Sequence, residues 1–177
     1  GFDFDGNDDL ISVPYDSSLN LSGTNKVFTL SAWIYVKDLS HDGGIIGRWQ
    51  GTGHHQYAMK FESDTNNIKF AVHDGDFKIA ESLDNSISQN TWTHVVAVAN
   101  GTNLSMYIDG MESFKTTPNY DNISIVGNDN LTIGEEGDSP NNYFEGLIDE
   151  LRISVDTRNQ SWVETSYNSV INQSIFH

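Results

Sequence analysis

Two acidic motifs, one near each end of the chain, carry the residue types and the spacing best suited to metal chemistry. They read Phe4-Asp5-Gly6-Asn7-Asp8-Asp9 and Phe144-Glu145-Gly146-Leu147-Ile148-Asp149. Calcium takes roughly six to eight oxygen ligands from carboxylates, amides, backbone carbonyls and water, and the first motif offers that mixture. The second motif adds a carboxylate if the first and last strands are neighbours. The predicted calcium ligands are Asp5, Gly6 through its carbonyl, Asn7, Asp9 and Asp149.

Each acidic motif also has a simpler interpretation. The first is then a solvated turn held by Asx hydrogen bonds, with Asp149 accepting backbone hydrogen bonds elsewhere. Carboxylates packed this closely repel one another, which favours a bound cation. A third acidic segment, residues 134–142, either holds a second ion, contacts a ligand or forms a solvated loop, and we favour the solvated loop.

Aromatic residues outside the predicted strands are the candidates for ligand binding. Sugars stack their apolar faces on Trp and Tyr, while amides and carboxylates bind their hydroxyl groups. Residues 48–56 are rich in glycine, which predicts a loop. The candidate ligand-binding residues are Trp49, His54, His55, Tyr120 and Tyr143. In the alternative interpretation Trp49 packs against a sheet edge and the two histidines are solvated.

The composition limits the partners and the location of the protein. The net charge of −16, from 9 basic and 25 acidic residues, predicts repulsion of nucleic acid and of anionic membranes. No stretch is apolar enough to insert into a bilayer. The chain has no cysteine, which fits a bacterial or archaeal surface protein better than a small disulfide-rich animal ectodomain. We therefore expect an extracellular or cell-surface protein of prokaryotic origin.

Glycosylation sequons support the same location. They start at Asn20, Asn100, Asn103, Asn122, Asn130, Asn159 and Asn172. Roughly three would arise by chance in a chain this rich in Asn, Ser and Thr. The excess predicts glycosylation, although a sequence of this composition also makes sequons by accident.

The elements that must position these residues are strands, because the dominant hydrophobic period is two. Strands are predicted at residues 28–36, 57–62, 68–73, 93–99, 104–108, 111–115, 123–126, 131–133 and 145–154. Asp109-Gly110 and residues 63–67 predict tight turns between successive strands. One helix is expected after the last strand, with Ser161 as N-cap and Glu164 completing a capping box. This pattern is typical of an all-β, antiparallel two-sheet sandwich or jelly roll with a short C-terminal helix.

An ordered set of segments carries a family resemblance. They are Phe4-Asp-Gly-Asn-Asp-Asp, Phe28-Thr-Leu-Ser-Ala-Trp-Ile, Gly44-Ile-Ile-Gly, Asn90-Thr-Trp-Thr-His-Val, Leu104-Ser-Met-Tyr-Ile-Asp-Gly, Leu131-Thr-Ile-Gly and Phe144-Glu-Gly-Leu-Ile-Asp-Glu-Leu-Arg-Ile. Over about residues 2–170 the chain resembles the laminin-G-like jelly rolls of the concanavalin A-like lectin/glucanase superfamily. The resemblance implies neighbouring end strands, ligands on the concave face or rim loops, and frequent calcium. It also implies that Trp33 and Trp92 lie in the core and that His94 makes a buried hydrogen bond.

The residues that would make this chain an enzyme are missing. Glucanases of the superfamily carry a Glu-x-Asp-x-(x)-Glu arrangement, which neither residues 62–67 nor residues 145–150 contain. The chain also lacks a Gly-x-Ser-x-Gly motif and a phosphate-cradling glycine loop. Adjacent His54 and His55 would point to opposite faces of a strand, which is poor geometry for zinc.

These observations predict a noncatalytic recognition module. Residues 1–177 form one domain of a larger surface protein, which binds a glycan or a surface protein and contacts neighbouring domains of the same chain. Calcium is the expected cofactor. The alternative is a structural spacer that has no small ligand, and a glycoside hydrolase is the third and least favoured class.

Overall fold

The computed structural model describes residues 1–51, 53–124, 127–137 and 142–171. The first sheet consists, in spatial order, of β1 (Phe2–Asp5), β14 (Glu145–Ser154), β4 (Val27–Val36), β9 (Trp92–Asn100), β10 (Leu104–Ile108) and β11 (Met111–Glu112). The second consists of β2 (Ile11–Val13), β13 (Leu131–Ile133), β5 (Gly43–Gln50), β6 (His54–Glu62), β7 (Asn67–His73) and β8 (Phe77–Glu81). The remaining elements are the pair β3 (Gly23–Thr24) and β12 (Asn122–Ile123), the 3-10 helix η1 (Ser17–Leu19) and the helix α1 (Gln160–Ile171).

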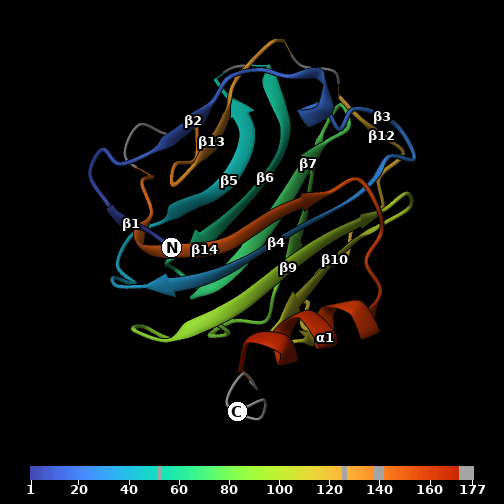
Figure 1. Ribbon diagram of the computed structural model, residues 1–177. Coiled ribbons are helices and arrows are strands. Elements are labelled where there is room, and N and C mark those ends of the chain that lie inside the picture. The colour runs from blue at the N-terminus through green and yellow to red at the C-terminus, as the bar shows by residue number, and fades with distance from the viewer. Residues whose placement is uncertain (52, 125–126, 138–141, 172–177) are drawn as a thin grey trace.

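The two sheets form two layers, and α1 lies outside the layer that contains β9 and β10 (Figure 1). All strand pairs in both sheets are antiparallel. The predicted two-sheet antiparallel sandwich with one C-terminal helix is therefore confirmed.

Strand β4 shows how the alternating pattern builds the core. Its inward side chains, such as Phe28, Leu30 and Ile34, are fully buried between the sheets. Burial of this apolar surface is the main stabilising contribution to such a sandwich. The outward side chains include Ser31 and Trp33, which are also buried because part of this outer face is covered by α1.

The predicted tight turns are present. Asp109 and Gly110 both have positive φ angles, 50° and 82°, as the tight turn between β10 and β11 requires. Glu62 pairs with Asn67 across the turn between β6 and β7. The predicted strand 111–115 is shorter than expected, since β11 ends at Glu112.

The first and last strands are neighbours, as predicted. Strand β1 pairs with β14, with Phe2 opposite Ile148 and Asp5 opposite Glu145. Phe4 is buried and packs edge-on against Phe144, with ring centroids 6.5 Å apart. The two ends of the sequence therefore close the same edge of the first sheet.

Helix α1 begins two residues earlier than the sequence suggested, at Gln160. The Trp162 amide donates to Asn159 Oδ1 at 3.0 Å, so Asn159 is the N-cap and the prediction of Ser161 is wrong. Glu164 accepts from the Gln160 side chain instead of closing a capping box. Val163 is buried against Val96 and Val98 of β9, which fastens the helix to the outer face of the first sheet.

Candidate functional site

The turn after β1, residues Asp5–Asp9, is held by its own side chains; we call it the acidic turn. Asp5 Oδ1 accepts from the backbone amide of Asn7 at 2.9 Å, and Asp9 Oδ2 accepts from the backbone amide of Asp5 at 3.1 Å. The Asn7 hydrogen bond is the main cause of the lowered pKa of Asp5. The carboxylates of Asp5, Asp8 and Asp9 come within 4.8 Å of one another and are exposed. The turn therefore gathers three carboxyl groups without burying any of them.

Asp149 does not join the acidic turn, so that part of the predicted site is wrong. The register of β1 and β14 puts Glu145, and not Asp149, opposite Asp5. Asp149 lies at the other end of β1, where its Oδ2 is 3.2 Å from the amino group of Gly1. The sequence identified the correct pair of strands but could not fix their register.

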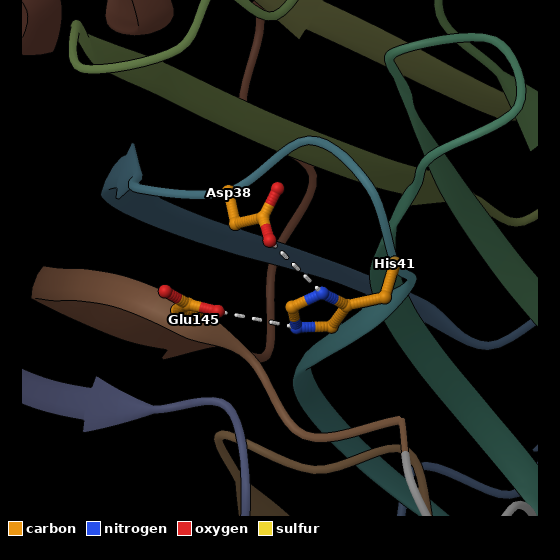
Figure 2. A group of neighbouring side chains, drawn as sticks. All are labelled: Asp38, His41 and Glu145. Carbon is orange, nitrogen blue, oxygen red and sulfur yellow. Dashed lines mark ion pairs between the residues drawn. The ribbon is translucent and has the colours of Figure 1, made fainter.

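A second group of possible metal ligands lies beside the acidic turn and was not predicted. Figure 2 shows the imidazole of His41 between the carboxylates of Asp38 and Glu145. His41 Nδ1 is 3.7 Å from Asp38 Oδ2, and His41 Nε2 is 3.7 Å from Glu145 Oε2. These partly buried groups could hold a metal ion. The two carboxylates face different ring nitrogens of His41.

The outward face of the second sheet carries a shallow cavity of about 90 Å³, which we call the outer groove. It is lined by Trp49, Ala58, Lys60, Lys69, Ala71, Phe77, Ile79 and Glu136. The two small alanines leave space between the larger aromatic and aliphatic side chains. Apolar surface with a few polar groups at its margin is the usual composition of a ligand site.

A β-bulge creates the aromatic end of the outer groove. The register between β5 and β6 shifts at Arg48 and Trp49. Arg48 is fully buried and donates to the Gln56 side chain at 2.9 Å and to the Gly127 carbonyl at 2.9 Å. Trp49 turns the other way and packs on His55 and Phe77, with ring centroids 4.6 and 5.3 Å away. Bulges commonly re-aim side chains in this way.

The polar end of the outer groove is a network of lysines and glutamates. Lys60 Nζ lies 2.8 Å from Glu62 and 3.0 Å from Glu136, and Lys69 Nζ lies 3.3 Å from Glu62 and 3.9 Å from Glu81. Burial acts to lower the pKa of Lys60, but its bonds to the two glutamates outweigh burial and raise that pKa. Both lysines of the groove are therefore neutralised by neighbouring carboxylates.

The five predicted ligand-binding residues separate into different environments. Trp49 lines the outer groove and His55 packs behind it, but they are only 7% and 9% exposed, and both lie in strands instead of the predicted loop 48–56. His54 is exposed and its Nδ1 is 2.9 Å from Asp129. Tyr143 is partly buried, and its backbone forms an isolated β-bridge with Glu135, next to the groove residue Glu136. Tyr120 is buried, and its hydroxyl bonds to the Lys26 carbonyl and the Gly101 amide, so its prediction as an exposed ligand contact is wrong.

Sequence reasoning missed Phe77 and Ile79, which are 47% and 37% exposed in the groove wall. The signal was present in the alternation of β8, where these residues take the positions opposite His73 and Ala71 of β7. This alternation did not identify a ligand site without the register of β8 against β7, because exposed apolar residues in an edge strand are common.

Trp92 and His94 also differ from expectation. Trp33 is buried as predicted, but Trp92 is 40% exposed because it opens β9 beyond the part of the sheet that α1 covers. His94 is buried, yet the hydrogen bond at this position is donated by its backbone amide to Asp109 Oδ1 at 2.9 Å. Its ring Nδ1 has no hydrogen-bond partner within the described residues.

The comparisons with known proteins agree with this architecture. Residues 5–164 match the family described as the concanavalin A-like lectin/glucanases superfamily. The chain belongs to the concanavalin A-like lectin/glucanase superfamily. No curated protein sequence matches it significantly.

Solved structures share the concanavalin A-like fold at low sequence identity. The binding domain of Paraclostridial Mosquitocidal Protein 1 is 23% identical, with a TM-score of 0.73 over 95% of this chain and 43% of that chain. The binding domain of botulinum neurotoxin serotype D is 17% identical, with a TM-score of 0.71 over 95% and 42%. Domain 4 of AbnA, an extracellular arabinanase from Geobacillus stearothermophilus, in complex with arabinotriose, is 20% identical, with a TM-score of 0.67 over 90% and 72%. The chain thus spans less than half of the toxin binding domains that it matches.

The predicted sequons of this concanavalin A-like domain lie in varied settings. Asn100, Asn122, Asn130 and Asn159 are exposed, Asn20 and Asn103 are partly buried, and Asn172 lies outside the described residues. Asn20 Oδ1 accepts from the Gln56 side chain at 2.7 Å, and Asn159 caps α1. Their glycosylation stays a prediction. No helix in the described part of the chain has the length and apolar character needed to cross a membrane.

Proposed function

We propose that this domain is a noncatalytic binding module that takes an uncharged saccharide in the outer groove. The observation that carries the proposal is the combination of Trp49, Phe77 and Ile79 with paired lysines and glutamates on one face of the second sheet. Sugar rings present C–H faces that stack on aromatic side chains, and their hydroxyls both donate and accept hydrogen bonds. The groove offers both kinds of contact side by side.

The charge network argues for an uncharged ligand. An acidic sugar would require a cation to offset its carboxylate, as arginine and lysine do in anion sites. Lys60 and Lys69 already contact Glu62, Glu81 and Glu136. The net charge of the whole chain is −16, which adds a general repulsion of anions.

The same network argues against catalysis. Glycosidases place two carboxylates on either side of the scissile bond, roughly 5–9.5 Å apart, as acid and as nucleophile or base. In the described part of the outer groove, each carboxylate is held in an ion pair with a lysine. Such an arrangement suits the binding of hydroxyl groups better than proton transfer to a leaving oxygen.

The relatives support an extracellular binding role. The AbnA domain is described in complex with arabinotriose, and the toxin domains are described as binding domains. We therefore propose that residues 1–177 are one domain of a larger extracellular or cell-surface protein of prokaryotic origin. Its partners are a glycan and the neighbouring domains of the same chain.

Calcium is proposed as a structural ion at the acidic turn. Asp5, Asp8 and Asp9 supply carboxylate oxygens, and the Gly6 carbonyl and the Asn7 amide oxygen are the other candidate ligands. Asp5 Oδ1 and Asp9 Oδ2 already accept backbone hydrogen bonds, which leaves the second oxygen of each carboxylate for an ion. Calcium would screen the mutual repulsion of the three carboxylates and stiffen the turn.

A structural spacer is the second candidate. The burial of Trp49, His55 and Tyr120 favours it, because three of the five aromatic and histidine candidates contribute little surface to a ligand. The two functions differ in one measurable respect, since a spacer binds no saccharide at all.

A glycan array, followed by calorimetry on the best ligand, tests the proposal. We expect binding to uncharged saccharides, no hydrolysis, and a loss of roughly tenfold or more in affinity for Phe77→Ala. The matched control is Phe114→Ala, which removes a similarly exposed ring outside the groove and should bind normally. A preference for sialylated or uronate glycans contradicts the ligand class, and silence across the array supports the spacer.

A further inference from the structure

The outward face of the first sheet contains a second and larger cavity, of about 250 Å³, at the C-terminal end of α1. Its lining residues are Trp33, Trp92, Asp149, Glu150, Val170 and Ile171. It lies on the opposite layer of the sandwich from the outer groove, so saccharide binding there does not account for it. We call it the helix-end pocket.

The fold builds the aromatic wall of this pocket from β4 and β9. Trp33 is buried and stacks on Tyr167 of α1, with ring centroids 5.7 Å apart at an interplanar angle of 15°. Trp92 lies beyond the helix, is 40% exposed and contacts Tyr35, with ring centroids 5.6 Å apart. Val170 closes the pocket on the helix side. The pocket thus places an exposed indole beside a buried one on the same face of the sheet.

A bulge supplies the acidic wall. In a regular strand Asp149 and Glu150 would point to opposite faces of the sheet. The register of β14 against β4 shifts between Asp149 and Arg152, and Glu150 has a φ of 51°. Both carboxylates consequently line the same pocket. Their side chains are 48% and 46% exposed, so they remain accessible to a ligand.

These carboxylates have partners at their outer edges. Asp149 accepts from the Glu150 amide at 2.8 Å and lies 3.2 Å from the amino group of Gly1, while Glu150 pairs with Arg152. The Glu150 amide, followed by the amino group of Gly1, is the main cause of the lowered pKa of Asp149. Each partner contact leaves carboxylate oxygens free to face a further cation, since a carboxylate has about four acceptor directions.

We propose that the helix-end pocket binds a quaternary ammonium group such as that of choline. Aromatic faces attract organic cations through their quadrupole, and nearby carboxylates add direct charge attraction. A primary ammonium could bond to the carboxylates but would find no acceptor on the indole and aliphatic side of the pocket, whereas a quaternary group needs no hydrogen bond and can contact that side through its methyl groups. The cavity is below the roughly 300–1,000 Å³ of sites for drug-sized ligands, which fits a single head group.

The test is a titration of the whole domain with choline. Binding is monitored by nitrogen-15 NMR through the indole N–H signals of the tryptophans. We expect a saturable shift of the Trp92 and Trp33 signals and none of the Trp49 signal. The uncharged isostere of choline, 3,3-dimethyl-1-butanol, should bind several-fold more weakly, since it keeps the shape but lacks the charge.

Variants distinguish specific recognition of the cation from nonspecific binding to an apolar cavity. Trp92→Ala should weaken choline binding about tenfold, Trp92→Phe should restore most of it, and Glu150→Gln should weaken it several-fold. Phe114→Ala, which removes an exposed ring that lines neither cavity, should bind choline normally. Equal affinity for choline and for the alcohol overturns the proposal, as does the absence of saturation by about 50 mM. Unchanged binding by Trp92→Ala also overturns it, provided that the variant keeps the thermal stability of the parent.

Discussion

His94 shows what one buried titratable residue does in this fold. Its side chain is 1% exposed and packs against both Trp33 and Tyr167, with ring centroids 5.2 and 6.3 Å away. Burial, and to a smaller extent the charge of Arg152, lowers the pKa of His94 to about 4. The imidazole is therefore neutral in the folded protein at pH values where an unfolded histidine is protonated.

This lowered pKa predicts a loss of stability in mild acid. Because the unfolded chain binds a proton that the folded chain does not, the free energy of unfolding is unaffected above about pH 6.5 and falls as pH drops toward 4. The slope due to one group is at most about 1.4 kcal/mol per pH unit. Urea unfolding between pH 4 and pH 7 measures it, and His94→Phe should flatten the slope in this window.

The control for this prediction is Val163→Ala, which loosens the packing of α1 on the same sheet but removes no titratable group, so it should lower stability without changing the slope. Aspartates with lowered pKa values, such as Asp5 and Asp38, lose their contribution only below about pH 4, outside the window. An equal slope in the parent and in His94→Phe would show that His94 is not responsible.

At the scale of the elements, the segment 134–137 and strand β5 hold one another in place. A Cβ atom at Gly44 would lie 2.1 Å from the backbone of Glu135 and Glu136. Such closeness explains a glycine at this position, because only a residue without a side chain lets two backbones approach so closely. The contact places Glu136 beside Lys60, where it completes the polar end of the outer groove.

Gly44→Ala should therefore damage both stability and binding. The backbone atoms it would meet cannot rotate away, so we expect a loss of about 3 kcal/mol, at the upper end of overpacking costs, and a weaker saccharide affinity. The matched control is Gly47→Ala on the same strand, where the nearest atom is the Ala58 side chain at 3.2 Å and a smaller loss is expected. Chemical denaturation of both variants compares them, and equal losses would contradict the explanation.

The elements differ in how well the sequence predicts them. Strand β4 and the Asp109-Gly110 turn were predictable because period-two alternation and turn chemistry are local properties. The end of β5 and the start of β6, residues 48–50 and 54–56, were predicted as part of a loop because of the glycines in this segment. The bulge at Asp149–Arg152 depends on pairing with β4, which no local pattern encodes.

At the scale of the whole molecule, the two outward faces of the sandwich have different chemistry. The second sheet presents aromatic residues with paired charges, and the first sheet presents aromatic residues with carboxylates beside the end of α1. The sequence predicted the sandwich and the closure of its ends, because these follow from strand number and order. It could not predict which tryptophan would be exposed, because the burial of Trp33 depends on its stacking against Tyr167 of α1, a contact that no local pattern encodes.

The closure of the chain ends leads to the calcium prediction. Strand β1 contributes four register pairs to β14 and is followed at once by the acidic turn, in a chain of net charge −16. An ion that binds only the folded turn stabilises the fold by mass action. We expect the melting temperature to be several degrees higher in excess calcium than in EDTA, measured by calorimetry at constant ionic strength.

Two variants and a second ion make this prediction specific. Asp8→Asn combined with Asp9→Asn should abolish the calcium response, whereas Asp149→Asn should keep it, because the register places Asp149 at the far end of β1. Magnesium at the same concentration should have a smaller effect, since it demands octahedral geometry and dehydrates reluctantly. Coincident melts in calcium and EDTA would mean that hydrogen bonds of the turn, such as that from the Asn7 amide to Asp5, suffice to hold β1 against β14.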